Sequence, residues 1–152
     1  MLSVGSKAPN FSLNDQDGNS VSLNDFSGQK LLIWFYPKSN TPGCTIEGQQ
    51  FRDEFSNFKK CNTVILGISA DTVKSQKNFC DKQNFPFSLL SDPDKDTINS
   101  FKAIGTKKMY GKEYEGILRV SYLVDEKGVI EKAYDKVKPK EHAKEVLDYI
   151  KG

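Results

Sequence analysis

The sequence predicts a mixed α/β fold in which a central mixed sheet is flanked by helices on both faces. Two continuous apolar runs, residues 31–36 and 64–69, have the pattern of strands that are buried on both faces. Each run is followed by a helical stretch, and the chain closes with a hairpin pattern and one more helix. Strands and helices that alternate in this order are typical of a sheet between helical layers.

The first elements follow from local signals. Residues 11–13 and 21–23 flank the turn-forming sequence NDQDGNS, which predicts an N-terminal β-hairpin. The strand at 31–36 stops at Pro37, because proline cannot donate to a sheet. A helix over about 42–58 follows. Its inward face is expected to carry residues at helical spacing from Cys44, namely Gly48, Phe51, Phe55 and Phe58.

The second half of the chain continues the alternation. The expected elements are a strand at 64–69, a helix at about 72–84, a short strand at 87–90, a helix at about 93–103, a hairpin of 117–124 and 129–134 joined by DEKG, and a helix at about 139–151. Ile98 and Phe101 are expected to point inward. The last helix has an apolar stripe formed by Ala143, Val146, Leu147 and Ile150. His142, the only histidine, is expected on a polar part of that helix, which leaves little for a Cys/His metal site.

This order of elements, with an N-terminal hairpin and one additional short strand and helix, resembles an elaborated thioredoxin fold. We expect a single domain over residues 1–152, because no linker, repeat or low-complexity segment interrupts the chain. In open α/β sheets the functional site lies beyond the carboxyl end of a strand, where a helix begins. Cys44 occupies that position after the first core strand.

The composition argues against several classes of protein. Its 22 Lys and Arg residues nearly balance 20 Asp and Glu residues, and no long basic run favours nucleic acid or an anionic membrane. The longest apolar run, 31–36, is too short to span a bilayer. The N-terminus has no apolar signal core, so we expect a cytoplasmic protein, in which three cysteines indicate catalysis or redox chemistry.

The segment Thr41-Pro42-Gly43-Cys44 has the pattern of a helix start. Thr41 is a natural N-cap whose hydroxyl is expected to accept a first-turn N–H, and Pro42 suits the first helical position. Gly43 allows another molecule to approach the backbone closely. Cys44 then lies at the electropositive helix terminus, where a thiolate is favoured over a thiol. The alternative is a cysteine buried as a small hydrophobic residue.

A helix terminus alone does not explain a strongly reactive cysteine. Lowering the pKa of a thiol from ~8.5 to ~6 requires about 3.4 kcal/mol of differential interaction, whereas a helix terminus contributes at most about 2 kcal/mol. Arg119 is the expected second contributor, because it lies in the otherwise apolar segment GILRVSYLVD and is one of only two arginines. A structural ion pair is the alternative role for this residue.

Residues 35–47, FYPKSNTPGCTIE, resemble the active-site segment of peroxiredoxins, and are especially similar to the Q-type subfamily, also called bacterioferritin comigratory protein. The segments VGSKAPNFSL and GILRVSYLVDEKG and the last helix are similar too, so the resemblance covers nearly the whole chain. It implies a thiol peroxidase that reduces hydrogen peroxide and organic hydroperoxides without a metal or organic cofactor. It also implies regeneration by thioredoxin or a similar dithiol donor, and a monomer.

The resemblance implies roles for individual residues. Cys44 would be the peroxidatic cysteine, which attacks one peroxide oxygen and becomes a sulfenic acid. Pro37 would shield the pocket, and Thr41 would hydrogen-bond the peroxide bound beside Gly43. Arg119 would hold the thiolate and the departing oxygen. These groups suit the chemistry, because they stabilise the negative charge that moves from sulfur to the leaving oxygen.

The resolving cysteine departs from one family pattern. Many Q-type members have a second cysteine five residues after the first, where this chain has Gln49. Another branch carries it in the next helix, and Cys80 fits that arrangement. Cys61 is a poor rival, because it is expected about 25 Å from Cys44 at the far end of the same helix. The helix of Cys80 has little to bury beyond Val73, Phe79 and Cys80, so we expect low local stability.

Several alternatives stay open from the sequence. Glu47 matches the family pattern and either orients an arginine or is simply an acid favoured by the helix dipole. Cys80 either resolves the sulfenic acid or leaves that task to an external thiol. A thiol–disulfide oxidoreductase on the same fold is the main rival function, although Thr41 stands where that class has the first cysteine of C-x-x-C.

Overall fold

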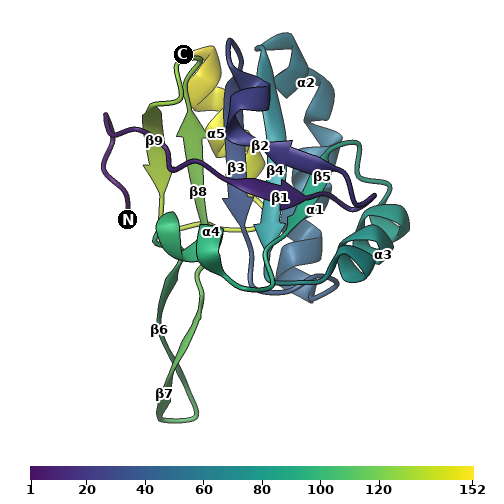
Figure 1. Cartoon of the computed structure of the whole chain (residues 1–152), viewed down its shortest axis with the longest axis vertical. Coiled ribbons are helices and arrows are strands. Elements are labelled where there is room, and N and C mark those ends of the chain that lie inside the picture. Colours follow the sequence, from purple (N-terminus) through teal and green to yellow (C-terminus); the bar gives the residue numbers. More distant parts are fainter.

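The computed structural model describes residues 1–152, apart from the side chain of Met109. Seven of the described strands form one mixed sheet: β1 (Ser12–Asn14), β2 (Ser20–Ser22), β3 (Lys30–Phe35), β4 (Thr63–Ser69), β5 (Ser88–Ser91), β8 (Val120–Val124) and β9 (Ile130–Tyr134). Their spatial order is β2-β1-β5-β4-β3-β8-β9 (Figure 1). Strands β3, β4 and β5 are parallel, whereas β1, β8 and β9 each run antiparallel to their neighbours.

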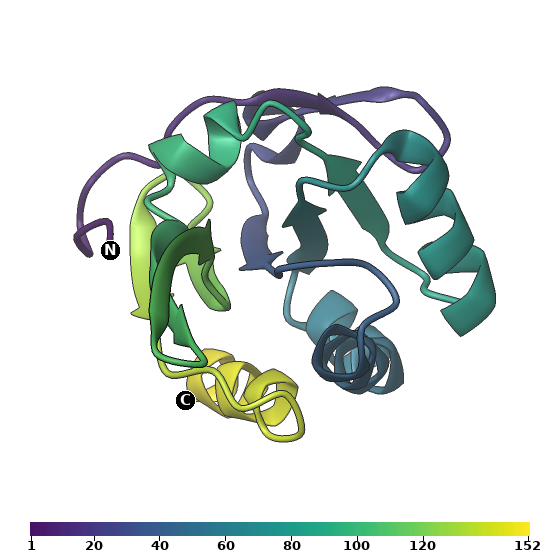
Figure 2. The same cartoon turned by 90° about the horizontal axis from the view of Figure 1, so that it is seen from below.

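Helices cover both faces of this sheet. They are η1 (Leu23–Phe26, a 3-10 turn), α1 (Pro42–Asp53), α2 (Phe55–Lys60), α3 (Val73–Gln83), α4 (Asp96–Ser100) and α5 (His142–Lys151). Side chains of α1, α2, α3 and α5 belong to one hydrophobic cluster, whereas α4 and the N-terminal segment belong to the other. Figure 2 shows α1 and α5 on one side of the sheet and α4 with the N-terminal segment on the other. The predicted mixed α/β architecture is confirmed.

Strand β3 is the centre of the molecule. It pairs with β4 from Lys30 opposite Thr63 to Phe35 opposite Ile68, and with β8 on its other side. Its residues from Leu31 onward are buried and alternate between the two clusters, with Trp34 in one and Phe35 in the other. Burial on both faces explains why this strand reads as one continuous apolar run.

Two predicted helices differ from the structure. The helix expected over about 42–58 is divided at Glu54, whose φ of −100° and ψ of 5° end α1 and precede α2. The peptide N–H of Glu54 bonds to both the Arg52 and Gln50 carbonyls, which tightens the turn there. The helix expected over about 93–103 is shorter, since only α4 is helical, but Ile98 and Phe101 are buried as predicted.

The structure adds a third hairpin to the two that the sequence predicts. Strands β6 (Ile104–Met109) and β7 (Lys112–Ile117) pair with each other only, and both turn residues, Tyr110 and Gly111, have the positive φ of a tight hairpin turn. The hairpin projects from the end of the sheet at which β3 ends (Figure 1). It also separates Arg119 from the predicted strand, because the strand expected over 117–124 is divided at Leu118 and Arg119. In the described part of the chain, no helix is long and apolar enough to cross a membrane.

Candidate active site

The loop after β3 leads directly into the candidate site. Thr41 has an extended backbone, and α1 begins at Pro42, as predicted. Cys44 is therefore the third helical residue, and its side chain is fully buried. It lies at the carboxyl end of the central strand and at the amino end of a helix, where backbone N–H groups and the helix dipole favour negative charge.

The prediction that the Thr41 side chain caps the helix with a hydrogen bond is wrong. The Thr41 hydroxyl donates to the Lys38 carbonyl oxygen at 2.7 Å and makes no side-chain bond to the first turn of α1. The tight loop between β3 and α1 brings this carbonyl within reach, and it competes for the hydroxyl. Because the hydroxyl proton is used on Lys38, the Thr41 oxygen still has lone pairs to accept a hydrogen bond from a bound molecule.

Arg119 faces the thiol of Cys44. Its Nη1 and Nη2 atoms each lie 3.5 Å from the Cys44 sulfur, so the planar guanidinium spans the thiol with both nitrogens. A Cβ atom on Gly43 would lie 3.0 Å from Arg119 Nη2, so glycine at this position lets the guanidinium rest on the start of α1. Arg119, expected from the sequence to add positive charge beside Cys44, therefore reaches the start of α1 from the break between β7 and β8.

Glu47 forms an ion pair with the same guanidinium. Its Oε1 accepts a hydrogen bond from Arg119 Nη1 at 2.8 Å, and its side chain is fully buried. Burial raises the pKa of Glu47 to about 7, although the charge of Arg119 opposes this shift. Of the two roles left open for Glu47, the structure supports the orientation of an arginine.

Lys107 was not singled out from the sequence, yet it lies near the same charges. Its aliphatic chain lies against Gly116 of the facing strand, where a Cβ atom would be 3.0 Å from Lys107 Cδ. Burial and the charge of Arg119 lower the pKa of Lys107, whereas the charge of Cys44 raises it. The hairpin β6–β7 that positions this lysine has no apolar pattern, so no signal in the sequence indicated it.

Pro37 and a hollow beside Arg119 complete the description of the predicted site residues. Pro37 is half-buried and lies in the loop between β3 and α1. A hollow of about 560 Å³ adjoins Arg119, and its walls combine apolar side chains with cationic ones, among them Val137, Lys102 and Lys138. Apart from Asp135, the charged side chains that line this hollow are cationic.

Cys80 lies in α3 and is buried against the same core cluster as Cys44. Its thiol is directed at the carbonyl oxygens of Phe85 (3.4 Å) and Phe87 (3.9 Å), and burial raises its pKa. The ring of Phe85 packs directly against Gly48 on α1. Aromatic side chains thus fill the space between the two cysteine helices, and both thiols are free.

Cys61 follows α2 and is half-buried, with a free thiol. It is at the far end of the α1–α2 segment from Cys44, as expected. The division of the helix at Glu54 does not return the chain towards Cys44, because α2 continues to Lys60 at the end of the sheet where β3 and β4 begin.

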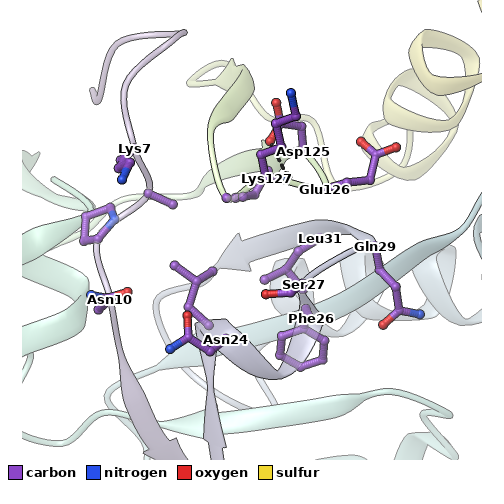
Figure 3. A pocket seen from close by; sticks show the side chains of 15 residues that line it. Lys7, Asn10, Asn24, Phe26, Ser27, Gln29, Leu31, Asp125, Glu126 and Lys127 are labelled. Carbon is purple, nitrogen blue, oxygen red and sulfur yellow. Dashed lines mark hydrogen bonds between the residues drawn. The ribbon is translucent and has the colours of Figure 1, made fainter.

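A polar cavity of about 490 Å³ lies at the opposite end of β3 (Figure 3). Its walls come from the N-terminal segment, η1 and the β8–β9 turn, and polar side chains such as Asn10, Asn24 and Gln29 line it. Because it is formed around the start of β3, it is separate from the Cys44 site. Among the described side chains, no group of three His, Cys, Asp or Glu residues is placed to hold a metal ion.

Comparison with known families agrees with this geometry. The profile of the AhpC/TSA family matches residues 4–133. The chain belongs to the AhpC/TSA family. A relative named putative peroxiredoxin bcp from Haemophilus influenzae is 45% identical over 151 residues, which cover 99% of this chain and 97% of the relative.

Solved structures give the same result. Xanthomonas campestris peroxiredoxin Q superposes with a TM-score of 0.88 at 42% identity, covering 93% of this chain and 89% of that one. A cysteine-to-serine mutant of Xylella fastidiosa PrxQ superposes with a TM-score of 0.94 at 36% identity, covering 99% and 96%. The predicted thioredoxin-like fold and peroxiredoxin family are confirmed. The chain is a thiol peroxidase, which reduces peroxides through a cysteine and is restored by thiol reductants.

Proposed function

We propose that Cys44 is the peroxidatic cysteine and that Cys80 resolves its oxidised form within the same chain. The observation that carries the first assignment is the contact of both Arg119 nitrogens with the Cys44 sulfur. A guanidinium at this distance stabilises a thiolate, and it can follow the negative charge to the leaving oxygen. Pro37, Thr41, Gly43 and Arg119 are assigned to the peroxide site.

The first step consumes one peroxide. The Cys44 thiolate attacks the outer oxygen of the peroxide, the O–O bond breaks, and the second oxygen leaves as an alkoxide or hydroxide that takes up a proton. Arg119 donates hydrogen bonds to the developing anion. The Thr41 oxygen accepts a hydrogen bond from the peroxide hydroxyl, since its own proton is held by Lys38. The product is a sulfenic acid on Cys44.

The second step forms a disulfide. The Cys80 thiol attacks the Cys44 sulfenic sulfur, a sulfur–sulfur bond forms and water leaves. The spacing of the two cysteines supports this pairing. Two structures of Xanthomonas campestris peroxiredoxin Q carry serine at one of two cysteines that are 36 residues apart, the separation of Cys44 and Cys80 here. A dithiol donor of the thioredoxin type would then exchange with this disulfide and restore both thiols.

The finer assignments form part of the same proposal. We assign hydrogen peroxide and organic hydroperoxides as substrates, because a neighbour, the Xanthomonas campestris bacterioferritin comigratory protein, is described by its alkyl peroxide reduction activity. Three free cysteines suit the reducing cytoplasm. We also propose one domain over residues 1–152, since both core clusters pack on the same sheet, and a monomer, which the family resemblance implies.

The test is intact mass with cysteine mapping after one equivalent of hydrogen peroxide without reductant. The proposal expects the loss of two hydrogens and a Cys44–Cys80 linkage. Added oxygen on Cys44 without a disulfide would instead mean a one-cysteine cycle that depends on an external thiol. An unmodified Cys44 would overturn its assignment as the peroxidatic residue.

A further inference from the structure

A buried amide joins the two cysteine-bearing segments. The side chain of Gln76, on α3, is fully buried, and both of its polar atoms are hydrogen-bonded. Its Oε1 accepts from the Tyr36 hydroxyl at 2.6 Å and lies 2.8 Å from the Ser39 hydroxyl, whose single proton it shares with the Asp71 carboxylate at 2.9 Å. Its Nε2 donates to Ser69 Oγ at 2.9 Å and to the Leu90 carbonyl at 2.8 Å.

These partners belong to different parts of the site. Tyr36 and Ser39 follow β3 and begin the loop that leads to Cys44. Gln76 lies one helical turn before Cys80, and both side chains are on the buried face of α3. Asp71 reinforces the junction, because its carboxylate accepts hydrogen bonds from the Ser39 N–H at 2.8 Å and from the Ser69 hydroxyl. The bridge therefore ties the helix of Cys80 to the loop of Cys44.

The bridge opposes the movement that a disulfide requires. Cys80 points at the carbonyls of Phe85 and Phe87, and the Phe85 ring packs between its segment and α1. To reach Cys44, the Cys80 thiol has to leave these contacts, and α3 has to unwind or detach around it. That motion withdraws Gln76 from Tyr36 and Ser39, which leaves buried polar groups without partners until water reaches them.

We propose that Gln76 is a positioning residue for the second step, which holds α3 against the Cys44 loop and so sets how fast Cys80 reaches the sulfenic acid. This inference rests on the proposed Cys44–Cys80 pairing. Its chemical consequence is a competition. While the bridge is closed, the sulfenic acid stays exposed to a second peroxide, which would convert it to a sulfinic acid with loss of water or alcohol. A tighter bridge therefore favours over-oxidation, and a weaker one favours the disulfide.

The test is Gln76→Met, which keeps the length of the side chain and removes its hydrogen bonds. Trp34, the only tryptophan, stacks on Tyr36 with ring centroids 4.4 Å apart and gives a fluorescence signal beside the bridge. In stopped-flow mixing with hydrogen peroxide, oxidation of Cys44 is the phase that depends on peroxide concentration, and resolution is the phase that does not.

We expect Gln76→Met to accelerate resolution about ten-fold, a change that corresponds to about 1.4 kcal/mol and to one or two neutral hydrogen bonds. The oxidation phase should change by less than about two-fold, since Gln76 does not touch the Cys44 sulfur. The peroxide concentration that gives half sulfinic acid, measured by mass spectrometry, should rise by the same factor as the resolution rate. A general loss of stability would not raise the resolution rate and this peroxide concentration by the same factor while it left the oxidation rate unchanged.

Two further variants separate the bridge from general stability. Ser39→Ala removes the Ser39 hydroxyl from both Gln76 and Asp71 but leaves the hydrogen bond from Tyr36. It should therefore also accelerate resolution, with little further gain when combined with Gln76→Met. Tyr122→Phe is the matched control, because it removes a buried 2.7 Å hydrogen bond to the Phe101 carbonyl in the opposite core cluster. Its resolution rate should equal that of the wild type.

The outcomes are distinct. If the bridge variants leave the resolution rate unchanged, or if Tyr122→Phe accelerates it equally, the role of Gln76 is overturned while the pairing of the cysteines stands. If the wild type forms no Cys44–Cys80 disulfide at all, the proposed function fails and this inference fails with it.

Discussion

Replacing Arg119 by methionine is expected to slow oxidation of Cys44 by hydrogen peroxide roughly 100-fold. Both guanidinium nitrogens lie 3.5 Å from the Cys44 sulfur, and a hydrogen bond to a charged group contributes about 1.5–3 kcal/mol. A ten-fold change in rate corresponds to about 1.4 kcal/mol, so losing ~3 kcal/mol of transition-state stabilisation gives the stated factor. Arg119→Lys keeps the charge without the planar fork, and its expected loss is about ten-fold.

The assay is the second-order rate constant from the fluorescence of Trp34, which shares the core cluster of Cys44. Arg52→Met is the matched control, because Arg52 is the other arginine and lies near the end of the same helix, paired with Asp53. The oxidation rate of this variant should stay within about two-fold of the wild type, because Arg52 contacts Asp53 and the Gln83 carbonyl and not the Cys44 sulfur.

The reasoning has two ways to fail. A rate for Arg119→Met within about three-fold of the wild type, in a folded variant, would show that the contact does not stabilise the transition state. The variant also leaves the Glu47 carboxylate buried without its partner. If Arg119→Met combined with Glu47→Gln restores the wild-type rate, the loss came from that isolated charge and not from the missing cation.

Three further predictions test the rest of the site. Cys80→Ser should keep the oxidation rate but abolish the disulfide and turnover with a thioredoxin-type donor, whereas Cys61→Ser should affect neither; mass mapping and coupled turnover measure both. Thr41→Val should lower the oxidation rate about ten-fold, and Thr41→Ser should restore it, because one hydrogen bond to the peroxide is lost and regained. Burial raises the pKa of Glu47 to about 7, so its contribution to stability is present below about pH 4.5 and is lost as the pH rises towards 7. Urea unfolding should therefore show Glu47→Gln gaining about 2–4 kcal/mol on the wild type across that range, and a constant difference would contradict the shift.

The chemistry of the site could be predicted from the sequence because the residues around Cys44 are adjacent in the chain. Threonine, proline and glycine before Cys44 define a helix start whatever the rest of the chain does, and the preceding apolar run fixes the strand that carries it. Arg119 was identified because a lone charge in an apolar segment requires a partner. The stabilisation that a helix terminus gives to a thiolate is too small by itself, which indicated that Cys44 needs a second source of positive charge.

The errors concern partners that only the folded chain brings together. The Thr41 hydroxyl meets the Lys38 carbonyl because the loop is tight, and no helix-capping rule includes that competitor. His142, expected on a polar part of α5, is fully buried, because its ring bonds to Ser121 on β8 at 2.8 Å and to Glu145 at 3.0 Å. Burial lowers its pKa, although Glu145 opposes the shift. A polar side chain that is buried because it bonds to a second element of the fold cannot be recognised from the pattern of apolar residues.

For the same reason, the apolar pattern did not reveal one buried residue of the Cys80 helix. Counting apolar residues finds little beyond Val73, Phe79 and Cys80 to hold α3 in place, which predicts a helix that opens easily. Gln76 changes this balance, because it is as buried as Phe79 and its amide is bonded at both ends. An apolar contact weakens gradually as a helix moves away, whereas a buried amide loses its partners at once and is left unsatisfied. A resolving helix that is thinly packed but held by one amide would stay closed during peroxide attack and open as a unit afterwards.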